Sequence, residues 1–379
     1  DADISNLNPY LELRRKYTVG YIGEERAFFT NLITMPFTLL GGMNLYNATL
    51  IVSVVSFLAR WLLFRVFVEI VPLPIFITAM CTIFMPTLLS WTGIIFKETY
   101  SFIALCVFLY IFIKPFGEWS FSQRIRYYSL AVIAAWVVLS IKGYILYSFM
   151  PFLLYFKFGS KFISQFNTFQ RILISGFAFL AVLGALVLAV TLTSGGLGQY
   201  SLDTLAATTA AKGNDLQSDY YYENQGSDSR YDLGEIDPTV AGIAAKFPIA
   251  TFTCLFRPLP YDVTSLQIGL SSLESTTIFL VFLLVLFKVG TGRAVKYLVS
   301  NPLIFSFLMF SIVYAFFVGL SAGNFGNLVR YRSPMMPFFT IGVIALYAFY
   351  LQEIREKKER QLLAYLREVK RRQLKSTGE

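Results

Sequence analysis

The sequence has no histidine and only three cysteines among its 379 residues. The absence of histidine excludes a Ser-His-Asp triad, acid–base catalysis by imidazole and a histidine-ligated metal. Cys81, Cys106 and Cys254 are far apart and lack metal-ligand spacing, which indicates small buried apolar residues. Any chemistry must therefore depend on carboxylates, lysine, arginine, tyrosine or the backbone.

Charged residues are scarce as well, at 15% of the chain, whereas 56% of the residues are hydrophobic. A soluble domain of this length would need more charge to cover its surface. The apolar residues come in blocks of about 17–25, the length that crosses the hydrocarbon core of a bilayer. The sequence therefore predicts an all-α, polytopic transmembrane helical bundle.

We expect about nine membrane helices from the length of these apolar blocks. They are placed near residues 48–68, 73–91, 99–115, 127–141, 144–157, 171–194, 266–289, 302–322 and 334–352. The pair that ends at 157 is interrupted by Lys142-Gly143-Tyr144, which predicts two helices that meet at a charged break. The apolar stretch 27–42 contains Asn31 and Pro36 and is expected to be interfacial or re-entrant.

The net charge of +9 is concentrated in the basic segment 353–375. A basic run directly after an apolar span marks the cytoplasmic side and anionic lipid headgroups more often than a nucleic-acid site. With this tail inside, the basic loops 114–126, 157–171 and 288–300 are also inside, and the acidic segment 195–265 is outside. Residue 1 then falls outside, and a preceding helix would fit this arrangement.

Four regions follow from this reading of the spans. They are residues 1–194 (transmembrane helices with an outer N-terminal segment), 195–265 (an extracytoplasmic loop), 266–352 (C-terminal transmembrane helices) and 353–379 (a basic cytoplasmic tail). The loop is too small and too polar for an independent domain, so we expect it to cap the outer face. No internal repeat stands out, which disfavours a transporter built from inverted halves.

Five cations fall at the predicted outer ends of the spans. They are Lys97, Lys142, Arg257, Arg330 and Arg332. Cations are disfavoured on the outer side, and charge near a bilayer is expensive, so this set predicts an anionic ligand such as a phosphate or pyrophosphate. Taken singly, each could instead be a headgroup anchor or an ion-pair partner, for example Arg257 with Asp262 or Glu274.

Other polar residues share this predicted face. Tyr144, Glu274 and Asn324 complete the candidate binding set. A sugar transfer needs a carboxylate near the acceptor hydroxyl, and the candidates are Asp1 and Asp3, which form a D-x-D pattern, together with Glu98 and Glu274. A divalent cation is possible, but the sequence has no dedicated cluster of ligands, and no metal site or other cofactor is predicted.

Several segments resemble one family. Residues 86–98 (PTLLSWTGIIFKE) resemble a segment of bacterial proteins from cell-surface polysaccharide loci that are similar to the GT-C superfamily of integral membrane glycosyltransferases. Residues 141–144 (IKGY), 255–258 (LFRP) and 324–332 (NFGNLVRYR) resemble further segments of that group. The resemblance spans most of the chain, but its motifs identify a group of proteins and not a reaction.

The resemblance implies a multi-pass enzyme of the bacterial inner membrane that moves a sugar from a polyprenyl-phosphate-linked donor to a glycan or lipid acceptor at the extracytoplasmic face. Asp1 and Asp3 would match the carboxylate of the first outer loop, which places them ahead of Glu98, and the five cations would match the residues that hold the lipid phosphate. Membrane lipids are expected partners, and nucleic acid is not. Two alternatives stay open: a polymerase or ligase of lipid-linked glycans, and a non-enzymatic lipid or polysaccharide transporter.

Overall fold

The computed structural model describes residues 25–113, 120–163, 229–237 and 239–376, and 165–177 except 168, 172 and 175. The fourteen elements named in these residues are all helices, so the predicted all-α class is confirmed. Asp1, Asp3, residues 178–194 of the predicted sixth span and residues 195–228 of the predicted loop lie outside the described residues.

Five helices are long and apolar enough to cross a membrane. They are α3 (Leu45–Ile70), α7 (Phe121–Ile163), α13 (Leu266–Val289), α15 (Pro302–Ser321) and α17 (Met336–Ser376). A bent pair, α4 (Ile75–Thr82) and α5 (Pro86–Thr92), raises the number to six if it forms one span. α6 (Lys97–Ile113) is apolar but has only 17 residues. The chain therefore has the helices of a multi-pass membrane protein, and the count of nine is not reached in the described residues.

The predicted span 73–91 is not one continuous helix. It is divided into α4 and α5, whose axes differ by 40°. α5 begins at Pro86, which has no N–H to donate to a preceding turn, so the helix restarts there.

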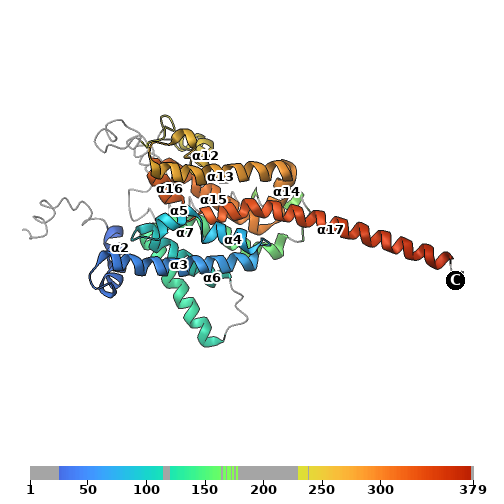
Figure 1. Ribbon diagram of the computed structural model, residues 1–379, viewed down its shortest axis with the longest axis horizontal. Coiled ribbons are helices and arrows are strands. Elements are labelled where there is room, and N and C mark those ends of the chain that lie inside the picture. Colours follow the sequence, from blue (N-terminus) through green and yellow to red (C-terminus); the bar gives the residue numbers. More distant parts are fainter. Residues whose placement is uncertain are drawn as a thin grey trace, which may run out of the picture.

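The break predicted at Lys142 is present within α7. Lys142 has φ −144° and ψ 66°, which are not helical values. The second arm of α7 follows α6, because Lys142 contacts Glu98 near the start of α6 and Lys157 donates to the Phe112 carbonyl near its end. The first arm diverges from the bundle (Figure 1).

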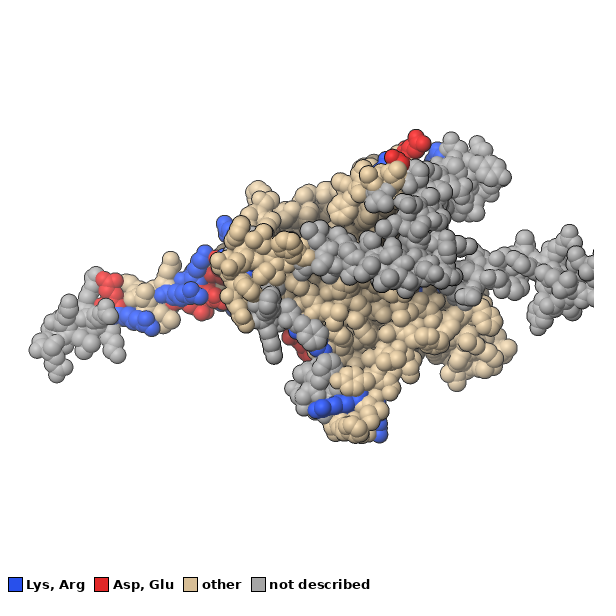
Figure 2. All heavy atoms as spheres, turned by 180° about the vertical axis from the view of Figure 1, so that it is seen from behind, with Lys and Arg blue, Asp and Glu red and all other residues tan. Residues whose placement is uncertain are grey.

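The two ends of the bundle differ. α5 and α16 (Phe325–Arg332) lie at one end, whereas α14 (Thr291–Ser300) and the projecting half of α17 lie at the opposite end (Figure 1). We call these the site end and the tail end. α2 (Glu25–Leu40), which covers the stretch predicted to be interfacial, also lies at the site end. Figure 2 shows charged side chains along the projecting helix and largely uncharged atoms over the flank of the bundle, as a surface in contact with lipid requires.

α15 is at the centre of the core. Phe307 and Phe310 of α15 pack edge-to-face on Phe338 of α17, with ring centroids 5.4 Å apart in both pairs. α12 (Phe247–Phe256) packs on the other side of α15, so closely that a Cβ on Gly319 would lie 2.1 Å from the Ala250 carbonyl oxygen. α12, like α11 (Val240–Ala245), lies within the predicted loop 195–265, but α12 is an apolar helix with a buried face, so this part of the loop belongs to the helical core.

Candidate functional site

The site end is organised by the short helix α16. Asn324 caps it by accepting a hydrogen bond from the Asn327 amide at 2.8 Å, and Gly323 enters the turn with φ +73°. Asn324, predicted as a binding residue, is therefore placed as a helix cap. α16 carries Arg330 and Arg332, both predicted to bind an anion, on two different sides that face different helices.

Arg330 faces α6 and α7, where it forms a cluster with two other predicted residues. Lys142 Nζ lies 2.7 Å from Glu98 Oε1, and Arg330 Nε lies 3.3 Å from the same oxygen, at ion-pair distance but without hydrogen-bond geometry. The side chains of Lys142 and Glu98 are 10% and 4% exposed. Two cations share one carboxylate in this Glu98 cluster, which leaves one positive charge. Glu98, predicted as catalytic, is positioned as their counter-ion.

Tyrosines surround the Glu98 cluster. Arg330 donates to the Tyr331 hydroxyl at 2.9 Å and to Asn327 Oδ1 at 3.1 Å. Lys142 Nζ lies 4.2 Å from the centroid of the Tyr331 ring and 5.8 Å from that of Tyr144. The rings stabilise the cations electrostatically while leaving their charge unneutralised. The Tyr144 ring thus lies beside the cluster, and its predicted role in substrate binding stays a prediction.

Arg257 is paired with a carboxylate near it in the sequence. Its guanidinium makes a two-pronged contact with Asp262, with Nε 3.0 Å from Oδ2, and the same carboxylate accepts the Leu259 amide at 2.8 Å. These hydrogen bonds to Asp262 raise the pKa of Arg257 above its usual value. The alternative of an ion-pair role for Arg257 is therefore confirmed, in the fork geometry that arginine and carboxylate favour.

Arg332 is fully buried between α12 and α13. Its guanidinium donates to the carbonyls of Cys254 and Arg257 at 2.9 and 2.6 Å and to Ser275 Oγ at 2.6 Å. It closes the C-terminal end of α12, where helix carbonyls lack partners. Arg332 was predicted to hold a phosphate, and its position instead gives it a structural role.

Glu274 also has a structural position. Its two oxygens accept the Thr87 amide and hydroxyl, each at 2.6 Å, and the residue is only 9% exposed. Thr87 is in the first turn of α5, where a carboxylate is favoured by the unpaired amides and the helix dipole. Glu274 therefore joins α13 to α5, the second helix of the bent α4–α5 pair. The sequence offered no sign of Thr87 as its partner.

The remaining predicted residues contribute less. Lys97 is the half-buried first residue of α6, next to Glu98. Asp1 and Asp3 lie outside the described residues, so their predicted role stays a prediction. In the part of the chain that the structure describes, no group of three or more cysteine, aspartate or glutamate residues could hold a metal ion.

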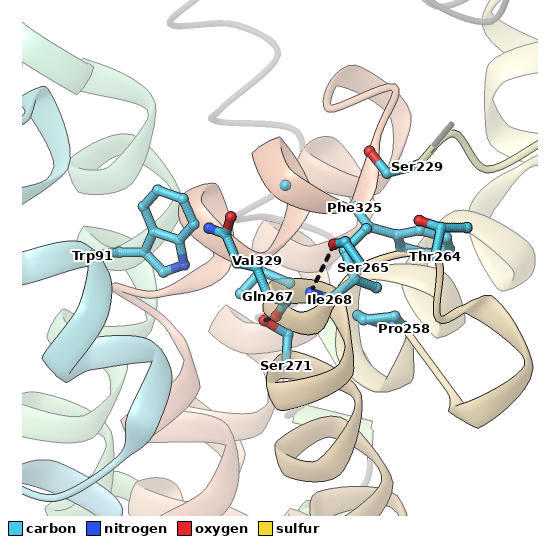
Figure 3. Close-up of a pocket in the computed structure, with 11 residues that line it drawn as sticks. Trp91, Ser229, Pro258, Thr264, Ser265, Gln267, Ile268, Ser271, Phe325 and Val329 are labelled. Atoms are coloured by element: carbon cyan, nitrogen blue, oxygen red, sulfur yellow. Dashed lines mark hydrogen bonds between the residues drawn. The ribbon is translucent and has the colours of Figure 1, made fainter. Parts of the chain in front are cut away.

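Two neighbouring cavities lie at the site end, and the first of them adjoins α16. The first, of about 370 Å³, lies between Trp91 of α5, the start of α13 and Phe325 of α16 (Figure 3), and we call it the polar pocket because hydroxyl and amide groups line it beside apolar side chains. The second, of about 720 Å³, is an apolar groove between the α4–α5 pair, α13 and α17. Trp91, Gln267 and Ser271 line both cavities, so the two cavities adjoin each other, and we refer to them as the joined cavities. Sequence reasoning missed them, although Gln267, Ser271 and Glu274 recur at helical spacing on one face of an apolar span.

The fold and these contacts define a multi-pass, all-α membrane protein with a cationic cluster and two joined cavities at one end. No protein-family model, curated protein or solved structure matches the chain. The resemblance to GT-C glycosyltransferases is therefore a hypothesis that must be judged on the site itself.

Proposed function

We propose that the protein is a membrane glycosyltransferase that moves a sugar from a polyprenyl-phosphate-linked donor to an acceptor at the extracytoplasmic face of a bacterial inner membrane. The observation that carries the proposal is the Glu98 cluster, where Lys142 and Arg330 share a single carboxylate. Buried charge at the end of a membrane bundle is costly, and an unbalanced cation there favours an anionic ligand.

The cluster has the donors that a phosphate monoester or diester needs. Arginine offers planar N–H pairs and lysine a point charge, and both would contact phosphate oxygens more strongly than a neutral headgroup. The side chain of Arg330 is 25% exposed, so a ligand can reach it. Arg257 and Arg332 serve the site indirectly, by fixing the ends of α12 and α16.

In the proposed reaction the acceptor hydroxyl attacks the anomeric carbon, and the bond from that carbon to the phosphate oxygen breaks. Negative charge grows on the departing polyprenyl phosphate, where Lys142 and Arg330 stabilise it more in the transition state than in the ground state. The hydroxyl proton passes to a carboxylate. Glu98 is occupied by two cations, and this favours Asp1 or Asp3 for that step.

Native mass spectrometry of the detergent-purified protein tests the proposal. A co-purifying species with the mass of a polyprenyl phosphate is expected, and Arg330→Gln should lower its occupancy about 10- to 100-fold, since a charged hydrogen bond contributes about 1.5–3 kcal/mol. The matched control is Arg355→Gln on the exposed tail, which should retain the lipid. If only ordinary phospholipids bind, equally in both variants, the protein is better described as a transporter or scaffold.

A further inference from the structure

The polar pocket and the apolar groove adjoin each other at the site end, where Trp91, Gln267 and Ser271 line both. The polar pocket is lined by hydroxyl and amide groups of Ser265, Gln267 and Ser271, with the Trp91 and Phe325 side chains beside them (Figure 3). The groove is lined mainly by apolar side chains of four helices. A polar chamber next to an apolar one fits an amphiphile with its head in the pocket and its chain in the groove.

The charge of the lining restricts the head group. Among the described residues, neither cavity is lined by a lysine or arginine, and the one charged residue is Glu274, in the groove. A phosphate at the junction would approach this carboxylate, and the cation that interacts with it, Arg332, is fully buried and donates its hydrogen bonds to other acceptors. Hydroxyls, an amide and an indole instead provide hydrogen bonds and a flat apolar surface for an uncharged, hydroxyl-rich group such as a sugar ring.

The joined cavities and the Glu98 cluster use different residues of α16. Phe325, Gly326 and Val329 line the pocket, whereas Arg330 contacts Glu98. Arg257, whose guanidinium lies 5.0 Å from the centroid of the Phe325 ring, is neutralised by Asp262. One short helix thus contributes to a site for an anion through Arg330 and to a site for a neutral group through Phe325, Gly326 and Val329.

We propose that the joined cavities bind a lipid with an uncharged, hydroxyl-rich head group, with its head in the polar pocket and its chain in the apolar groove. Under the proposed function, on which this role rests, that lipid is the acceptor and the phosphate-bearing donor occupies the Glu98 cluster. The binding itself does not depend on the transfer reaction.

The test uses the full chain in phosphatidylcholine nanodiscs that contain equal small amounts of a monoglucosyl diacylglycerol and phosphatidylglycerol with the same acyl chains. Native mass spectrometry should show the glucolipid retained at least about tenfold more than the anionic lipid, since several hydrogen bonds distinguish the two heads. Ser271→Trp, which fills the junction of the cavities, should abolish that preference. Leu280→Trp, on the same helix but outside both cavities, should keep it.

A second variant covers the possibility that Ser271→Trp fails to fold. Gln267 is exposed in the pocket, so Gln267→Arg should be tolerated and should reverse the preference toward phosphatidylglycerol. Equal retention of both lipids by the unaltered protein, or an unchanged preference in Gln267→Arg, would overturn the proposal. Arg330→Gln should keep the glucolipid while losing polyprenyl phosphate, so failure here and failure of the proposed function are distinguishable.

Discussion

Replacement of Glu98 by glutamine would show whether this carboxylate is the counter-ion of Lys142 and Arg330 or the base of a reaction. Glutamine keeps the shape of the side chain but removes its charge, leaving the buried Lys142 and the partly exposed Arg330 without a carboxylate. Because Glu98 and Lys142 are 4% and 10% exposed, solvent screens them little. Loss of one member of a buried pair costs about 3–5 kcal/mol, so Glu98→Gln should reduce the free energy of unfolding by that amount.

A double-mutant cycle separates the pair from its surroundings. Lys142→Met alone leaves Glu98 with Arg330 and should be destabilising. The double variant Glu98→Gln with Lys142→Met should lose about 0.5–3 kcal/mol less free energy of unfolding than the sum of the losses in the two single variants. The free energies can be measured by denaturant unfolding in mixed micelles, followed by tryptophan fluorescence. Glu356→Gln, at an exposed ion pair on α17, is the control and should change stability by less than about 1 kcal/mol.

Activity gives the second readout of the same variants. If Glu98 is a counter-ion, the folded fraction of Glu98→Gln should still turn over once an anionic donor is bound. An additive cycle, together with a stable Glu98→Gln protein that has no turnover, would refute the counter-ion assignment and return Glu98 to the role of base.

Three further predictions concern the scaffold. Arg332→Lys should lower the melting temperature, because lysine cannot supply the fork that Arg332 uses, and each buried acceptor left unpaired costs about 1–3 kcal/mol; a melting temperature like that of the unaltered protein would contradict this role. Gly319→Ala should cost about 1–3 kcal/mol in unfolding experiments, because its methyl group would meet the Ala250 carbonyl, whereas Gly292→Ala, with nothing within 4 Å, should be close to neutral. At Glu353, hydrogen bonds from Lys357 and Tyr297 lower the carboxyl pKa from 4.5 to about 2. A carboxyl whose pKa is lowered in the folded state stabilises the fold at pH values above its pKa in the unfolded state. In thermal melts, the stability advantage over Glu353→Gln should therefore be full above pH 4.5 and vanish as the pH falls toward about 2. An advantage independent of pH would contradict the pairing.

The sequence predicted features that depend on local composition. The break at Lys142 could be predicted because a lysine and a glycine interrupt an apolar run. Charge counts along the chain also separated the cations near α5, α6 and α16 from the basic tail, and these helices begin or lie at the end of the bundle opposite the projecting half of α17 (Figure 1). The division of residues 73–91 at Pro86 was missed, although proline at a helix start is a known signal.

The pairing of charges could not be predicted. Glu98 meets Arg330 from a distant part of the chain, and nothing in either segment specifies which of five cations it contacts. The polar pocket is formed where α5, α13 and α16 pack, so its residues read as ordinary members of three separate segments. Arg332 and Arg330 are two positions apart and look equivalent in the sequence, yet the helical turn directs Arg332 into the core and Arg330 toward the Glu98 cluster.

The continuous helix α17 limits how far the membrane surface can attract the basic tail. Residues 355–368 are exposed, and the helix continues straight away from the bundle (Figure 1). At 1.5 Å per residue, Arg367 lies about 22 Å along the helix beyond residue 352, where the predicted span ends. At physiological salt, the attraction between exposed charges is largely screened beyond a distance of about 8 Å. Only the cations of the first turns, such as Arg355 and Lys358, therefore remain within the electrostatic reach of lipid headgroups, and the more distant ones present their charge to the aqueous phase.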